Sequence, residues 1–87
     1  MLVEPYRQVI TAEMLPYLRT CRNLNQSQFA EMIGIPQPSL SQLETGEKGI
    51  SDYYEKAIRN GITKLRISNE EINYIKQILE VKERMGF

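Results

Sequence analysis

Histidine is absent from this chain of 87 residues, and cysteine occurs once, at Cys21. Without histidine, the chain lacks Ser-His and Cys-His pairs that activate nucleophiles, histidine general bases and histidine metal ligands. A single cysteine excludes a disulfide framework and a cysteine-based zinc site. We therefore expect a protein that is not an enzyme, binds no metal and needs no cofactor.

Long apolar runs and an excess of charge of either sign are also missing. No stretch approaches the roughly 18 consecutive apolar residues of a membrane helix. The first residues, MLVEPYRQVI, lack the basic start and apolar stretch of a secretion signal, so we expect a cytoplasmic protein without membrane contact. Eleven basic and eleven acidic residues give a net charge of zero. Binding to nucleic acid therefore cannot rely on a broad basic surface.

The composition is that of one globular domain with one modest core, since 41% of the residues are hydrophobic and 25% are charged. Capping and turn-forming residues divide the sequence into short helical units. We expect an all-α fold, a compact bundle of about five helices that begin near Thr11, Asn25, Pro36, Ser51 and Ser68. The predicted organisation is an N-terminal arm (1–10), a helical domain (11–62) and a C-terminal helical extension (63–87).

Three local features bear on where the helices end. Pro16 falls inside the first apolar pattern, so we expect a kink there or a helix that becomes regular only after Leu15. Asn60-Gly61 should stop the fourth helix. Residues 63–67, TKLRI, are the one stretch that alternates as a short strand would.

The segment from Gln26 to Leu43 reads QSQFAEMIGIPQPSLSQL and is followed by Glu44-Thr45-Gly46. Ala30 is small where two helices would cross, and Gly34 permits a tight turn between them. The joint spacing resembles the helix-turn-helix of the lambda-repressor and Cro-like (Xre) family of DNA-binding regulators. The resemblance extends over roughly residues 11–62, which would make this range the DNA-binding domain.

The resemblance implies a sequence-specific transcriptional regulator that binds a double-stranded DNA operator, as phage repressors do, through a recognition helix in the major groove. Residues aligned with base contacts are Gln37, Pro38, Ser41 and Gln42, and those aligned with phosphate contacts are Gln26, Ser39, Thr45 and Lys48. Glutamine suits this role because its amide can pair with adenine N6 and N7. The resemblance also implies a structural ion pair between Arg19 and Glu44.

A broad apolar stripe follows the stretch from residue 69 to residue 85, and it has three interpretations. The helix could pack on its own domain, or the stripe could dock on a different protein. Part of it could instead contact a second copy of the chain, because phage-type repressors bind pseudo-palindromes as dimers. The candidate residues for a homodimer contact are Ile72, Ile75, Ile78, Leu79 and Met85.

A second function remains open beside DNA binding. The neutral charge and the acidic residue Glu47, which follows the third helix, favour a protein-interaction module on a helix-turn-helix scaffold. Such a module would bind a protein partner, as an antitoxin or antirepressor does, with weak or no DNA binding. The uncharged pattern of Gln37 and Gln42 favours DNA recognition instead.

Overall fold

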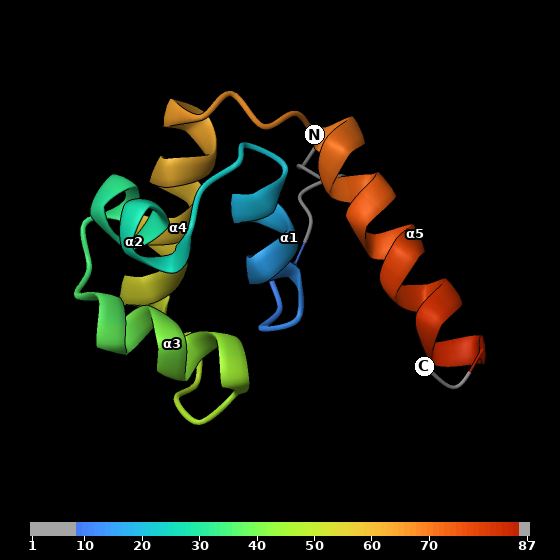
Figure 1. Cartoon of the computed structure of the whole chain (residues 1–87), viewed down its shortest axis with the longest axis horizontal. Helices are drawn as coiled ribbons and strands as arrows, with labels where there is room; N and C mark the ends of the chain where they lie inside the picture. The colour runs from blue at the N-terminus through green and yellow to red at the C-terminus, as the bar shows by residue number, and fades with distance from the viewer. Residues whose placement is uncertain (1–8, 86–87) are drawn as a thin grey trace, which may run out of the picture.

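The computed structural model describes residues 9–85, which form five α-helices and, within that range, no strand (Figure 1). The helices are α1 (Met14–Thr20), α2 (Gln26–Ile33), α3 (Gln37–Thr45), α4 (Asp52–Lys64) and α5 (Asn69–Met85). This confirms the predicted all-α bundle. Most of the predicted N-terminal arm, residues 1–8, lies outside the described residues. Ile10, assigned to the arm, is instead buried in the core.

The ends of α2 and α3 follow the capping signals of the sequence. Asn25 and Gln28 form a reciprocal capping box at the start of α2, and Gly34 ends it in a left-handed conformation with φ of 77°. Pro38 lies in the first turn of α3, where a missing N–H has no intrahelical partner to lose. Gly46 ends α3, also with positive φ. The turn between α2 and α3 is therefore determined locally.

The start of α1 differs from the prediction. Thr11 does not cap the helix with its hydroxyl; its carbonyl accepts a hydrogen bond from Met14 N at 3.1 Å in the turn that precedes α1. Because α1 begins at Met14, Pro16 is its third residue and needs no intrahelical acceptor. The proline is thus accommodated by a late helix start.

The predicted end of α4 at Asn60-Gly61 is wrong, because α4 continues to Lys64. Gly61 is buried, and a Cβ built on it would collide with the side chain of Ile33 in α2. The glycine is needed for the close approach of α2 and α4 and does not end the helix. The stretch 63–67 forms the last residues of α4 and the turn after it, so its alternating pattern does not form a strand.

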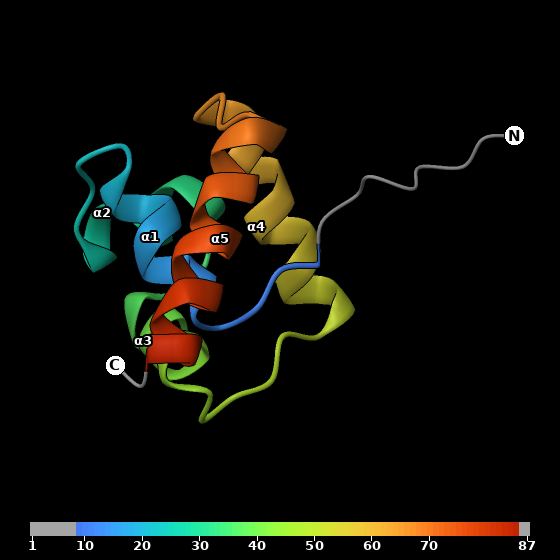
Figure 2. The ribbon, with the colours of Figure 1, turned by 90° about the vertical axis from the view of Figure 1, so that its right-hand side faces the viewer.

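One hydrophobic core joins all five helices. Its fully buried members include Phe29, Leu40, Leu43 and Ile58, and residues after α4 belong to the same cluster. Figure 1 shows α1 between the group of α2, α3 and α4 on one side and α5 on the other, and Figure 2 shows α5 lying across α1. The stretch after residue 62 therefore completes this core.

The apolar stripe of α5 divides into two faces. Ile72 and Ile75, predicted as homodimer contacts, are buried against the rest of the chain, and Leu79 packs beside them. These side chains are buried because they cover the side of α1 that faces α5. Ile78 and Met85 remain exposed. None of the described helices is long and apolar enough to cross a membrane.

Arg22, just after α1, fastens the chain segment that connects α4 to α5. Its guanidinium donates to the carbonyls of Leu65 at 3.0 Å and Arg66 at 2.9 Å. It also forms a two-point ion pair with Glu71, at 2.7 and 2.9 Å. Glu71 in turn accepts from the backbone N–H of Ser68, which caps α5. One side chain thus holds the end of α4 and the start of α5 against α1.

The ion pair between Arg22 and Glu71 makes the stability of the fold depend on pH. Hydrogen bonds from Arg22 and then from the Ser68 backbone lower the pKa of Glu71 from 4.5 to about 2. Because the folded-state pKa is the lower one, the stabilisation is complete above about pH 4.5 and is lost as the pH falls toward 2. We predict that the free energy of unfolding falls less steeply over this range in Glu71→Gln than in the wild type.

Urea unfolding at a series of pH values measures this slope, and Glu70→Gln is the matched control. Glu70 is an exposed carboxylate in the same first turn of α5, so its removal should leave the steep fall in place. If the free energy of unfolding changed equally with pH in the wild type and in Glu71→Gln, the stabilising role of the Arg22–Glu71 ion pair would be contradicted.

Candidate nucleic-acid interface

Helix α3 presents a polar face away from the core. Leu40 and Leu43 are fully buried and hold one side of the helix against the domain. The opposite side carries two exposed residues and two half-buried ones, namely Pro38, Thr45, Ser41 and Gln42. Gln37 and Glu44 flank this face on one side and Ser39 on the other, because successive helical residues are rotated by about 100°. The side chains predicted to contact bases therefore share the outward part of one short helix.

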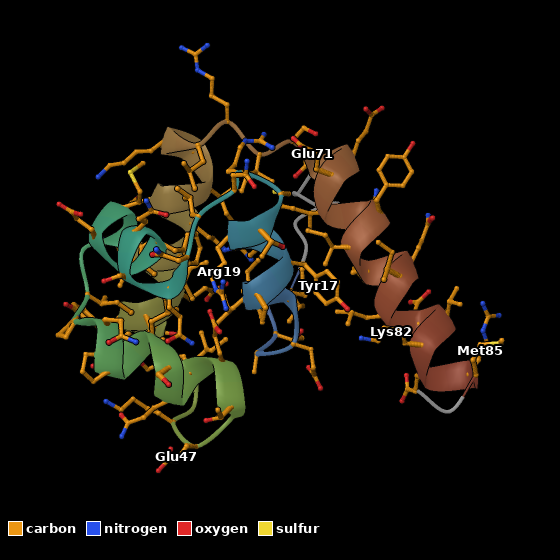
Figure 3. All side chains as sticks on the ribbon, viewed as in Figure 1. Tyr17, Arg19, Glu47, Glu71, Lys82 and Met85 are labelled. Atoms are coloured by element: carbon orange, nitrogen blue, oxygen red, sulfur yellow. The ribbon has the colours of Figure 1, made fainter. Side chains whose placement is uncertain are left out.

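A chain of hydrogen bonds crosses from α1 to the start of α3. Arg19 forms a two-point ion pair with Glu44, with Nε to Oε2 at 2.8 Å and Nη2 to Oε1 at 3.2 Å. Gln26 Nε2 donates to Glu44 Oε1 at 2.9 Å, and Gln37 Nε2 donates to Gln26 Oε1 at 2.7 Å. We call these four residues, Arg19, Glu44, Gln26 and Gln37, the polar relay. Figure 3 shows Arg19 on the side of α1 that faces α2 and α3.

The relay determines how the Gln37 amide is oriented. A carboxylate that pairs with a guanidinium only accepts hydrogen bonds, so Gln26 must present its NH₂ group to Glu44. Gln26 then presents its carbonyl oxygen to Gln37, and Gln37 must donate a hydrogen bond to it from its own NH₂ group. The orientation at the surface thus follows from the charge of Arg19, three hydrogen-bonding steps away.

Gln37 keeps a free donor and a free acceptor. An amide has two N–H donors and a carbonyl oxygen, and only one N–H is used by Gln26. Gln37 is exposed, so its second N–H and its oxygen are open to a ligand. A donor beside an acceptor is the pattern that pairs with adenine N7 and N6 in the major groove.

The predicted phosphate contacts occupy different environments. Gln26 belongs to the polar relay, so its amide is largely occupied within the chain. Thr45 donates its hydroxyl to the carbonyl of Gln42 at 3.1 Å, a bond local to the end of α3. Within residues 9–85, no hydrogen bond involves the side chains of Ser41 or Gln42. Both side chains are half buried, and the described fold leaves their hydrogen-bonding groups unused.

Ser39 and Lys48 gather around Tyr54, which is not among the residues predicted to contact DNA. Lys48 Nζ donates to Tyr54 Oη at 3.3 Å and lies 5.5 Å from the centre of its ring. The hydrogen bond from Lys48, and a second from Ser39, lower the pKa of the Tyr54 hydroxyl. No sequence signal joins Lys48, in the loop after α3, to a residue six positions later in α4.

Acidic Glu47 projects from the loop after α3, as Figure 3 shows. It is exposed and next to Lys48 in the chain. Residues 9–85 contain no group of three or more His, Cys, Asp or Glu that could hold a metal ion. The outward region around α3 therefore has little net charge and many neutral hydrogen-bonding groups.

Two helices joined by a tight turn, with the second helix presenting a polar face, define a helix-turn-helix unit. A family model described as helix-turn-helix matches residues 17–53, the range that contains α2, α3 and the polar relay. No curated protein and no solved structure gives a significant match to the chain. The match confirms the resemblance over residues 17–53: this segment is a helix-turn-helix of the type found in the lambda-repressor and Cro-like family of DNA-binding regulators.

The Arg19–Glu44 pair should stabilise the fold measurably. Side-chain exposure is 19% for Arg19 and 7% for Glu44, so removal of one partner leaves a largely buried charge without its counter-ion. We predict that Arg19→Met or Glu44→Gln alone lowers the free energy of unfolding by about 3 kcal/mol. The double variant should lose clearly less than the sum.

Chemical denaturation of the four proteins gives the coupling free energy. Additive effects of the two substitutions would contradict a direct interaction between these side chains.

Proposed function

We propose that this protein is a sequence-specific DNA-binding transcriptional regulator of the repressor type, with α3 as the recognition helix in the major groove. The observation that carries the proposal is the exposed Gln37 amide, which the polar relay holds with a free donor and a free acceptor. The proposed activity is binding in the cytoplasm, without a chemical step or a cofactor.

The dimensions of α3 suit this role. A helix with its side chains is about 10–12 Å across, and the major groove of B-DNA is about 12 Å wide. The outward face of α3 would place Gln37, Ser41 and Gln42 along the base edges. Pro38 offers only apolar contact, which suits a thymine methyl group.

The charge around α3 makes base recognition more important than general attraction to DNA. Arg19 is neutralised by Glu44 inside the domain, and Lys48 has the exposed carboxylate of Glu47 beside it in the chain. Few released counter-ions give weak non-specific binding and a shallow dependence on salt. Discrimination between sequences would then come mainly from hydrogen bonds made by α3.

The preferred base at one operator position should depend on Gln37. In a binding selection from random duplex DNA at low salt, the wild type should enrich an adenine that Gln37→Ala no longer prefers. At that base pair we predict a loss of about 1–3 kcal/mol of discrimination. Gln77→Ala, which removes an exposed glutamine from α5, should leave the selected sequence unchanged.

Gln26→Ala should weaken the same preference without removing the contacting side chain, because it releases the Gln37 amide from its fixed orientation. If Gln37→Ala selected the same sequence as the wild type, Gln37 would not be the residue of α3 that recognises the base. If the wild type selected no sequence at all, the proposed function would fail.

We also propose a homodimer, in which the exposed face of α5 contacts a second copy. Tyr74, Ile78, Val81 and Met85 follow one another at spacings of four, three and four residues, the pattern of a two-helix seam. Their exposed fractions are 63%, 45%, 45% and 63%, so the described chain leaves this seam uncovered. This outer seam replaces the predicted contact through Ile72 and Ile75, which the core occupies.

An antiparallel arrangement of the two α5 helices fits their charges. The first turn of α5 carries Glu70, and the last turn carries Arg84. Antiparallel packing brings each acidic start toward the basic end of the other copy, and it also pairs the helix dipoles favourably. A two-fold dimer of this kind has two α3 helices, as a pseudo-palindromic operator requires.

Substitutions on the two faces of α5 should separate assembly from folding. Ile78→Glu or Val81→Glu should give a folded monomer, because both side chains are already half exposed in the single chain. Ile75→Glu is the matched control and should instead lower the thermal midpoint, because Ile75 is buried. Sedimentation velocity across concentration measures assembly, and circular dichroism measures folding.

A wild-type chain that stays monomeric up to about 100 μM would contradict the homodimer, because the association free energy would then be weaker than about −5.5 kcal/mol. The alternative function, a protein-interaction module of the antitoxin or antirepressor kind, is favoured by the same exposed seam. A monomeric wild type that also selected no DNA sequence would favour this alternative.

A further inference from the structure

The cluster of Lys48, Tyr54 and Ser39 lies on the flank of α3 opposite the polar relay. Ser39 comes from the first turn of α3, Lys48 from the loop after it and Tyr54 from the first turn of α4. All three are half buried. Three elements thus bring hydrogen-bonding groups to one place beside the outward face of α3.

Lys48 differs from the arginines that form ion pairs. Arg19, Arg22 and Arg59 each pair with a carboxylate. No salt bridge to Lys48 is formed within residues 9–85, and its ammonium lies instead against the neutral ring and hydroxyl of Tyr54. The positive charge is therefore held in place without being neutralised by a bonded carboxylate.

The hydrogen bonds inside the cluster leave free donors on Lys48 and Tyr54 for a ligand. Lys48 uses one of its three N–H groups on Tyr54 Oη. Because Tyr54 Oη accepts that bond, its own O–H remains a donor. Several fixed donors and one unneutralised positive charge match an anion with more than one acceptor oxygen, such as a phosphodiester.

The position of the cluster identifies which phosphodiester would fit. A helix in the major groove has a sugar-phosphate backbone on each side, and contacts to these backbones fix the register of the protein on the duplex. Because Ser39 and the polar relay lie on opposite flanks of α3, the cluster would meet one wall of the groove while Gln37 reads base edges.

We infer that Tyr54 is a DNA-contacting residue, whose hydroxyl, hydrogen-bonded by Ser39, joins Lys48 in binding one backbone phosphate and which holds the Lys48 ammonium ready for that contact. The inference rests on the proposed function, since it needs α3 in the groove of duplex DNA. It adds Tyr54, a residue that neither the resemblance nor the sequence spacing assigned to the interface.

Tyr54→Phe tests the hydroxyl and keeps the ring that packs on the core and faces Lys48. We expect affinity for the selected duplex and for random duplex to fall by the same factor, about 3- to 10-fold, as expected for loss of one hydrogen bond and its preorganisation. The slope of affinity against salt should stay unchanged because no charge is lost. Lys48→Met should also weaken both duplexes and should reduce that slope by about one.

The chain supplies a matched control in Tyr17→Phe. Lys82 Nζ donates to Tyr17 Oη at 2.8 Å and lies 5.5 Å from its ring centre, the same arrangement as in the cluster. Figure 3 shows this pair between α1 and α5, on the side of α1 away from α3. Tyr17→Phe should therefore leave DNA affinity unchanged, so that an effect of Tyr54→Phe cannot come from the general loss of a lysine–tyrosine bond.

The measurements are fluorescence anisotropy titrations at several salt concentrations, with thermal unfolding as a check that each variant is folded. Wild-type affinity for Tyr54→Phe, or an equal loss in Tyr17→Phe, would overturn the inference while DNA binding itself stood. Should Tyr54→Phe not fold, Ser39→Ala takes its place, with the same uniform loss expected and wild-type affinity overturning it. A wild type that binds no duplex would overturn the proposed function together with this inference.

Discussion

The ion pair between Arg19 and Glu44 is the interaction on which the candidate interface depends. It joins α1 to the end of α3, and the buried Glu44 carboxylate also receives Gln26 from the start of α2. Burial of two charges costs free energy, which a two-point ion pair with further hydrogen bonds offsets. In return the three helices are fixed relative to one another, and the acceptor-only carboxylate imposes one direction on every bond out to Gln37. The ion pair on the core side of α3 thus determines the orientation of the Gln37 amide on its outer surface.

The same construction, a charged side chain that fastens two elements, recurs where α5 joins the domain. Arg22 binds the carbonyls at the end of α4 and the Glu71 carboxylate at the start of α5. This leaves α5 with one face against α1 and the other, from Tyr74 to Met85, exposed. The candidate interface around α3 and the seam on α5 lie on different parts of the molecule, so substitutions can test the proposed DNA recognition and the proposed assembly separately.

Signals that act over a few residues predicted much of this structure. The capping box at Asn25, the positive-φ glycines at 34 and 46 and the Ser68–Glu71 cap each depend on neighbours within four positions. The prediction that Gly61 ends α4 is wrong because glycine has two uses: it ends helices, and it also permits two helices to approach closely. Only the position of Ile33 in the folded chain distinguishes these uses. The division of the α5 stripe was likewise hidden, since periodicity shows which residues are apolar and not which partner covers them.

At the interface, the resemblance suggested the Arg19–Glu44 pair and the residues along α3, but not the connection among them. Gln26 was assigned to phosphate, yet its amide bridges Glu44 and Gln37. Tyr54 was missed because its contact with Lys48 is made across a loop, and nothing in the intervening residues marks it. Contacts between side chains of different elements can be identified only in the packed fold, whereas residue types suited to the major groove of DNA can be recognised in the sequence.

The most direct measurement of the central claim is NMR of the side-chain amide protons of Gln26 and Gln37 in the free protein. The polar relay predicts that one N–H of each amide is shifted and protected from exchange with water. It also predicts that Glu44→Ala returns the Gln37 amide to the shift and exchange rate of a free glutamine, although no hydrogen bond joins Gln37 to Glu44 directly. If Gln37 showed free-amide behaviour already in the wild type, or kept its shift in Glu44→Ala, the ion pair between Arg19 and Glu44 would not orient the Gln37 amide in the way described.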